Sequence, residues 1–110
     1  MSKYSGSTFI FICLYTLSQN CLNAREVITF ISLDNERTVI RGELFKPKNV
    51  NKPPAIVMMH GCSGLYTRSG NLRTNSASWI NRFLEWGYIV LAVDGFTPRG
   101  FRTMCKKKNR

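Results

Sequence analysis

The sequence Ala55-Ile-Val-Met-Met-His-Gly-Cys-Ser-Gly64 decides the fold, because five apolar residues run directly into a His-Gly-x-x-Gly segment. A short, continuous apolar run of this kind is typical of a strand that is buried on both faces of a sheet. The glycine-bracketed turn that follows places backbone N–H groups at the carboxyl end of that strand. Such groups can stabilise a negatively charged oxygen, so residues 60–64 are the first candidates for a functional site.

The residues after this segment predict a loop, a helix and a second buried strand. Residues 61–74 are rich in Gly, Ser, Arg and Asn, which is typical of a surface loop. Asn75 or Ser76 is expected to cap the helix, and Gly87 is expected to end it. The apolar residues of the helix recur at helical spacing: Trp79, Ile80, Phe83, Leu84 and Trp86. Residues 88–93 are then fully apolar, so a strand–helix–strand unit with two parallel strands and a right-handed crossover is expected.

An antiparallel hairpin is predicted before this unit. Residues 27–33 are apolar and β-branched, residues 34–36 have turn chemistry, and residues 38–45 alternate between the two sides of a strand. Ile40 and Leu44 are expected to face the core.

The predicted fold class is therefore α/β, with a hairpin followed by a strand, a loop, a helix and a strand. Pro53 and Pro54 cannot donate ladder hydrogen bonds, so the third strand is expected to begin at about Ala55. Because a single helix is predicted, we expect one bare sheet face and one unpaired edge, and hence poor solubility or stability.

The first 24 residues have the three-part layout of a secretory signal peptide. Lys3 supplies a positive charge, residues 9–17 form an uncharged apolar core, and a polar stretch leads to Ala24, the expected cleavage site. The apolar core is too short to cross a bilayer as a helix. The alternative is that residues 9–17 form the first strand or helix of the domain. With a cleaved leader the protein is expected to be exported, periplasmic or secreted, and otherwise to be cytoplasmic.

The chain is strongly basic, with 16 Lys and Arg against 6 Asp and Glu and a net charge of +10. No acid follows Asp94, whereas six basic residues do: Arg99, Arg102, Lys106, Lys107, Lys108 and Arg110. One function class is therefore a small basic module that binds nucleic acid or anionic membrane through this tail, and the other interpretation is a solvated terminus. The last nine residues contain no aromatic side chain, so they lack the stacking groups of a single-strand binder.

The cysteine and histidine content limits the disulfides and metal sites that the chain can form. Cys13 and Cys21 lie in the expected leader, which leaves Cys62 and Cys105 to pair if the protein is exported. The cysteine spacings match no zinc pattern, and the chain has a single histidine. No metal site is expected.

Two blocks of the sequence resemble the dienelactone hydrolase family of the α/β-hydrolase superfamily. The first block is residues 54–65 (PAIVMMHGCSGL), and the second comprises Trp79, Phe83 and residues 86–100 (WGYIVLAVDGFTPRG). A helix that ends in x-W-G-Y, followed by an apolar strand and D-x-F-x-P-R-G, is similar to secreted or periplasmic members of that family. The resemblance covers residues 37–105, and it implies that residues 25–110 form the N-terminal part of such a domain, with an incomplete α/β-hydrolase sheet.

The resemblance implies hydrolysis of small carboxylic esters or lactones by a nucleophile–His–Asp triad, without a cofactor. Carried onto this sequence, the backbone N–H groups of Cys62 and Ser63 would form the oxyanion hole. His60, Gly61 and Gly64 would support the oxyanion loop. The triad residues are expected beyond Arg110, so this chain is expected to be truncated before the nucleophile elbow and to be inactive alone.

Some residues of the chain invite a catalytic role, but another role is preferred for each. Cys62 or Ser63 is disfavoured as the nucleophile, because Leu65 stands where a G-x-S-x-G elbow requires its second glycine. His60 either bonds to the loop backbone or contacts substrate, and the triad base is expected later in the chain. Asp94 is expected to cap the loop after its strand.

Overall fold

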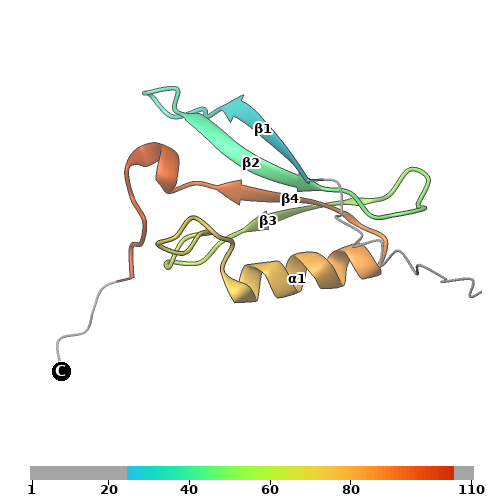
Figure 1. Cartoon of the computed structure of the whole chain (residues 1–110). Coiled ribbons are helices and arrows are strands. Elements are labelled where there is room, and N and C mark those ends of the chain that lie inside the picture. The colour runs from blue at the N-terminus through green and yellow to red at the C-terminus, as the bar shows by residue number, and fades with distance from the viewer. Residues whose placement is uncertain (1–24, 106–110) are drawn as a thin grey trace, which may run out of the picture.

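The computed structural model describes residues 25–105, which form a four-stranded mixed sheet with one helix packed on it (Figure 1). The elements, in chain order, are β1 (Arg25–Ile31), β2 (Val39–Phe45), β3 (Ala55–Met59), α1 (Thr74–Glu85), β4 (Ile89–Asp94) and the short 3-10 helix η1 (Thr97–Arg99). The order across the sheet is β1-β2-β4-β3, with β3 and β4 parallel and the other pairs antiparallel. The predicted α/β class and element order are confirmed. The predicted leader, residues 1–24, lies outside the described residues, as do residues 106–110.

The β1–β2 hairpin forms as the sequence predicts, and Asp34 holds its turn. The Oδ1 atom of Asp34 accepts a hydrogen bond from the N–H of Thr38 at 2.9 Å, and its carbonyl accepts one from the N–H of Arg37 at 3.0 Å. The strand β1 starts at Arg25 rather than at residue 27, because it pairs along the whole length of β2.

The core lies between α1 and one face of the sheet. Its buried side chains are Phe45, Leu65, Ile80, Leu84, Val90 and Ala92. Residues that lie opposite each other in neighbouring strands share a face, so Phe45 and Glu43 of β2 lie on the face that α1 covers.

The prediction that Ile40 and Leu44 face the core is therefore wrong for the core beneath α1, because neither side chain lies on the sheet face that α1 covers. Ile40 is buried and Leu44 is half-buried, but both lie on the face away from α1, whereas Phe45 packs beneath the helix. The residues of β2 are apolar on both faces, so the alternation alone does not say which face the helix covers.

The helix α1 begins earlier than predicted, and tertiary contacts set its start. Its N-cap residue is Arg73, which makes no side-chain capping bond, so the prediction of Asn75 or Ser76 as the cap is wrong. The N–H of Arg73 donates to the carbonyl of Leu65 at 3.0 Å, and its Nε donates to the carbonyl of Ser63 at 2.9 Å. These two bonds hold Arg73 in an extended conformation at the point where the helix starts.

The end of α1 agrees with the prediction at Gly87. This glycine has φ 85°, and its N–H donates to the carbonyl of Leu84 at 3.0 Å. The N–H of Tyr88 donates to the carbonyl of Phe83 at 2.9 Å. The two bonds form a Schellman motif, which ends the helix and turns the chain into β4.

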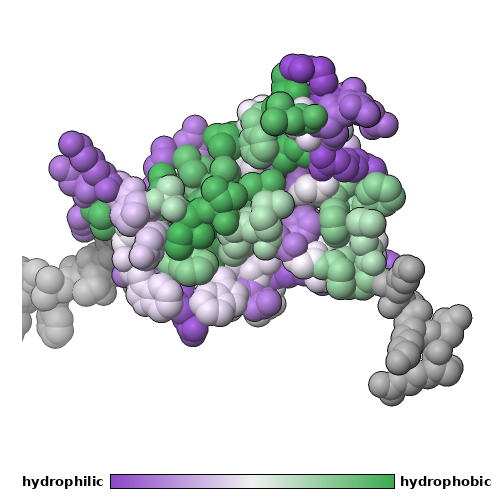
Figure 2. All heavy atoms as spheres, turned by 180° about the vertical axis from the view of Figure 1, so that it is seen from behind, coloured by the Kyte–Doolittle hydropathy of each residue, from purple (hydrophilic) through white to green (hydrophobic). Residues whose placement is uncertain are grey.

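The sheet face opposite α1 carries exposed apolar side chains. Seen from behind, hydrophobic side chains gather across the middle of the molecule (Figure 2). Phe30, Val57 and Met59, which the register places on the face away from α1, are 40%, 63% and 64% exposed. Strands β1 and β3 are the edges of this sheet. The predicted bare face and unpaired edge are thus present in residues 25–105.

The helices of residues 25–105 include none with the length and hydrophobicity that a membrane span requires.

Candidate functional site

The candidate site is the turn Gly61–Gly64, at the carboxyl end of β3. The N–H of Gly64 donates to the carbonyl of Gly61 at 3.0 Å, which closes a β-turn with Cys62 and Ser63 at its centre. Within residues 25–105, the backbone N–H groups of Cys62 and Ser63 donate no hydrogen bond. The two N–H groups predicted as oxyanion donors therefore lie on one turn and have no hydrogen-bond acceptor within this part of the chain.

His60 joins this turn to the end of β4. Its Nδ1 lies 2.9 Å from the carbonyl of Gly61, and its Nε2 accepts a hydrogen bond from the N–H of Gly95 at 3.2 Å. These partners assign the proton to Nδ1. The ring also packs edge-on against Phe96, with the ring centroids 4.4 Å apart. Of the two roles considered for His60, the structure matches the bond to loop backbone, because both ring nitrogens are engaged there.

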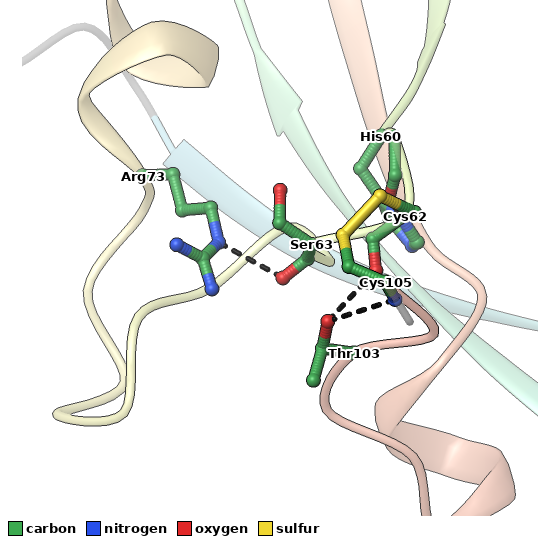
Figure 3. Close-up of a disulfide and its surroundings, with 7 residues drawn as sticks. His60, Cys62, Ser63, Arg73, Thr103 and Cys105 are labelled. Carbon is green, nitrogen blue, oxygen red and sulfur yellow. Dashed lines mark hydrogen bonds between the residues drawn. A yellow bond between two sulfur atoms is a disulfide. The ribbon is translucent and has the colours of Figure 1, made fainter. Parts of the chain in front are cut away.

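Segment 101–105 lies against the turn and is joined to it by a disulfide (Figure 3). Cys62 and Cys105 are bonded, with their Cα atoms 4.9 Å apart. The carbonyl of Cys62 also accepts hydrogen bonds from Thr103 Oγ1 at 3.0 Å and from the N–H of Met104 at 2.7 Å. The cysteine pairing considered from sequence is thus present, and the Cys62 sulfur is not a free thiol.

Asp94 caps the turn after β4, the role preferred for it from sequence. It is 1% exposed, and its Oδ1 accepts hydrogen bonds from the N–H of Phe96 at 3.2 Å and of Thr97 at 3.1 Å. These bonds satisfy the N–H groups of Phe96, the residue before η1, and of Thr97, its first residue. The structure therefore gives Asp94 a structural task beside the candidate turn.

A buried carboxylate on β2 was not identified from sequence. Glu43 is fully buried, and its Oε1 accepts hydrogen bonds from Arg25 Nη2 at 2.6 Å and from the Tyr66 hydroxyl at 2.5 Å. Burial, together with the hydrogen bond to Glu43, raises the pKa of Tyr66 above its usual value. The alternation of residues 38–45 puts Glu43 on the side opposite Ile40 and Leu44, which are the residues expected to face the core. No pattern in the sequence indicates that Tyr66 contacts Glu43.

No model of a known protein family matches the chain, and no curated protein matches it.

Among residues 25–105, no three His, Cys, Asp or Glu side chains are grouped so that they could hold a metal ion.

Proposed function

We propose that this chain supplies the N-terminal part of a dienelactone hydrolase-type α/β-hydrolase that acts on small carboxylic esters or lactones. The observation that carries the proposal is the turn after β3, where the N–H groups of Cys62 and Ser63 have no hydrogen-bond acceptor among residues 25–105. In α/β-hydrolases one oxyanion donor comes from the loop between the third strand and the following helix. The turn Gly61–Gly64 lies in the loop between β3 and α1, which supports the same role here.

The chemistry of this role is stabilisation of negative charge. Attack on an ester carbonyl turns its oxygen into an oxyanion, and each donor held in place beforehand contributes about 3 kcal/mol to its stabilisation. The His60 ring bonds both to the carbonyl of Gly61 in the turn and to the N–H of Gly95, and the Cys62–Cys105 disulfide ties the turn to segment 101–105. These links support a role in which the donors are held in place before the reaction.

The nucleophile is proposed to come from outside the turn. Cys62 is bonded to Cys105, so its sulfur cannot attack a carbonyl in this state. A G-x-[CS]-x-G elbow, with the acid and base of the triad after it, is expected in sequence beyond Arg110.

Export is part of the same proposal. Disulfides persist in secreted and periplasmic proteins and are rare in reducing compartments, so the Cys62–Cys105 bond supports the leader predicted in residues 1–24. Mass spectrometry of the mature protein is expected to find Arg25 at its N-terminus. A mature N-terminus at Met1 would contradict export by cleavage.

The oxyanion role is tested in a polypeptide extended through the codons that follow Arg110. Ser63→Pro removes one N–H donor, whereas the matched Ser63→Ala removes the hydroxyl and keeps the N–H. Hydrolysis of a simple aryl ester is expected to fall roughly 10²- to 10³-fold in the proline variant and to stay close to the unmodified rate in the alanine variant. Equal rates in two folded variants would reject the role, with folding checked by circular dichroism.

A second candidate function is binding of nucleic acid or an anionic membrane surface, which the net charge of +10 favours. Its test is retention on heparin by the full chain and by a variant in which Lys106, Lys107 and Lys108 become Gln, so that Cys105 and its disulfide stay. Salt-dependent retention that weakens in the variant would support this function. Retention that is unchanged in the variant would reject it.

A further inference from the structure

A cavity of about 400 Å³ lies beside the candidate turn, between β2, β4 and the loop that follows the turn. Neither Cys62 nor Ser63 lines it, so it is separate from the oxyanion donors. Four arginines line the cavity: Arg25, Arg41, Arg68 and Arg102. The acidic residues of its wall are Glu43 and Asp94.

The charges of this cavity favour an anion. Arg25 pairs with Glu43, and Asp94 Oδ1 accepts its hydrogen bonds from backbone N–H groups. Among residues 25–105, no carboxylate forms an ion pair with the three remaining lining arginines, which are Arg41, Arg68 and Arg102. The planar guanidinium group presents several N–H donors and binds oxyanions in a forked geometry.

The buried carboxylate of Glu43 adds a second requirement. Its Oε1 has two donors, but its Oε2 is buried and has no hydrogen-bond partner within residues 25–105. A buried carboxylate oxygen without a donor is costly, and Glu43 forms part of the cavity wall. An occupant that donates a hydrogen bond to Oε2 removes this cost, whereas an anion without a proton repels the carboxylate.

We propose that the cavity binds a small oxyanion that keeps one O–H group. The anionic oxygens contact the guanidinium groups of Arg41, Arg68 and Arg102, and the O–H donates to Glu43 Oε2. Hydrogen phosphate and a small hydroxycarboxylate share this chemistry. This site goes beyond the proposed ester hydrolysis, because it requires neither the oxyanion turn nor a nucleophile.

The proposal is tested by calorimetric titration of the full chain with two matched pairs of anions. Phosphate and sulfate have similar size and shape, but at neutral pH only phosphate keeps a proton, and glycolate differs from acetate by a hydroxyl. A hydrogen bond to a charged group corresponds to roughly a tenfold gain in affinity. If the ligand is phosphate, phosphate is expected to bind about tenfold more tightly than sulfate. If the ligand is a hydroxycarboxylate, glycolate is expected to bind more tightly than acetate. Equal affinities within both pairs, or no binding of any of the four, would overturn the proposal.

Variants separate the donor requirement from the charge requirement. Glu43→Gln turns the acceptor at Oε2 into an amide that can donate, so the preference for phosphate over sulfate is expected to disappear or reverse. Arg68→Gln is expected to weaken both anions alike and leave their ratio unchanged. Arg37→Gln, in the β1–β2 turn away from the cavity lining, is the charge-matched control and is expected to change neither.

The result that counts against the proposal is a folded Glu43→Gln variant with the same phosphate-to-sulfate ratio as the unmodified chain. If the Glu43→Gln variant does not fold, the proposal is still tested by the ratio of phosphate to sulfate affinity in the unmodified chain and by the effect of Arg68→Gln on both affinities. An Arg68→Gln variant that binds both anions as tightly as the unmodified chain would also reject the site.

Discussion

At the scale of single residues, the candidate turn depends on Gly64. Its φ of 81° lies in the left-handed region, where a residue with a Cβ atom is strained. A Cβ atom at this position would also collide with the carbonyl oxygen of Arg102, which belongs to segment 101–105. Gly70 has nearly the same φ, 82°, but open space where its Cβ would lie. A comparison of substitutions at the two glycines therefore distinguishes the cost of backbone strain from the cost of lost packing against segment 101–105.

Replacement of these glycines by alanine is expected to give unequal losses of stability. Gly70→Ala should lower the free energy of unfolding by about 1 kcal/mol, which is the cost of the left-handed conformation. Gly64→Ala should cost more, because the carbonyl of Arg102 must also move. Urea unfolding of the two variants measures both losses, and equal losses would show that segment 101–105 does not pack against the turn.

Asp34 gives the hairpin a stability that depends on pH. Its pKa is lowered to about 2, first by the hydrogen bond from the backbone N–H of Thr38 and then by the bond from the Arg99 side chain. The pKa of an unfolded aspartate is about 3.9, so the folded value lies below the unfolded one. The stabilisation from this carboxylate is therefore complete above about pH 4 and is lost as the pH falls toward 2.

Urea unfolding between pH 2 and pH 6 tests this contribution. The unmodified chain is expected to lose more stability on acidification than Asp34→Asn, which has no carboxylate to protonate. Asn35→Ala, a change in the same turn that alters no charge, should keep the pH dependence of the unmodified chain. The same pH dependence in the unmodified chain and in Asp34→Asn would contradict the account.

At the scale of elements, periodicity and turn residues predict the α/β order, the start of β3 and the end of α1. They do not predict the start of α1, because Arg73 is held by bonds to Ser63 and Leu65, residues that lie before it in the loop. They also do not predict the helix-covered face of β2, since that strand has apolar residues on both sides.

Part of the candidate site can likewise be predicted from the sequence, and part cannot. The turn at Cys62 and Ser63 is visible in sequence because its glycines and the preceding apolar strand are local signals. The partners of Glu43 are not visible, because Arg25 and Tyr66 approach it from elements distant in the chain. Local patterns thus locate the turn, and only the fold reveals the cavity beside it.

The packing of α1 on the sheet gives a prediction at this scale. Ile80 is 2% exposed in the core, whereas its neighbour Trp79 is 43% exposed. Ile80→Val is expected to lower the free energy of unfolding by about 0.5–1.5 kcal/mol, the usual cost of one buried methyl group. Trp79→Phe, at the exposed neighbour, should cost less in the same urea unfolding experiment. A larger loss at Trp79 than at Ile80 would place the core on the other side of the helix.

At the scale of the whole molecule, a disulfide cross-link joins two distant parts of the chain. The Cys62–Cys105 disulfide joins residues 43 positions apart, so it ties the end of the described chain to the turn after β3. The bare sheet face with Phe30, Val57 and Met59 remains exposed, which leaves the fold with little apolar burial to spare. A cross-link of this length is therefore expected to carry a substantial share of the stability.

Reduction of this disulfide is expected to lower the free energy of unfolding by about 2–4 kcal/mol. The Cys105→Ser variant should show the same loss without reductant and no further loss when a dithiol is added. Urea unfolding with and without the dithiol measures both. Equal stability of the oxidised and reduced chain would contradict the predicted contribution.

The proposed family is tested most directly by reading the gene past codon 110 in all three frames. We expect a G-x-[CS]-x-G elbow within the following sequence, with Asp and His codons after it, in the same frame or after a shift. Such a reading would supply the nucleophile, acid and base that the oxyanion turn at Cys62 and Ser63 requires. The absence of an elbow and of later Asp and His codons in every frame would contradict the hydrolase proposal for this protein.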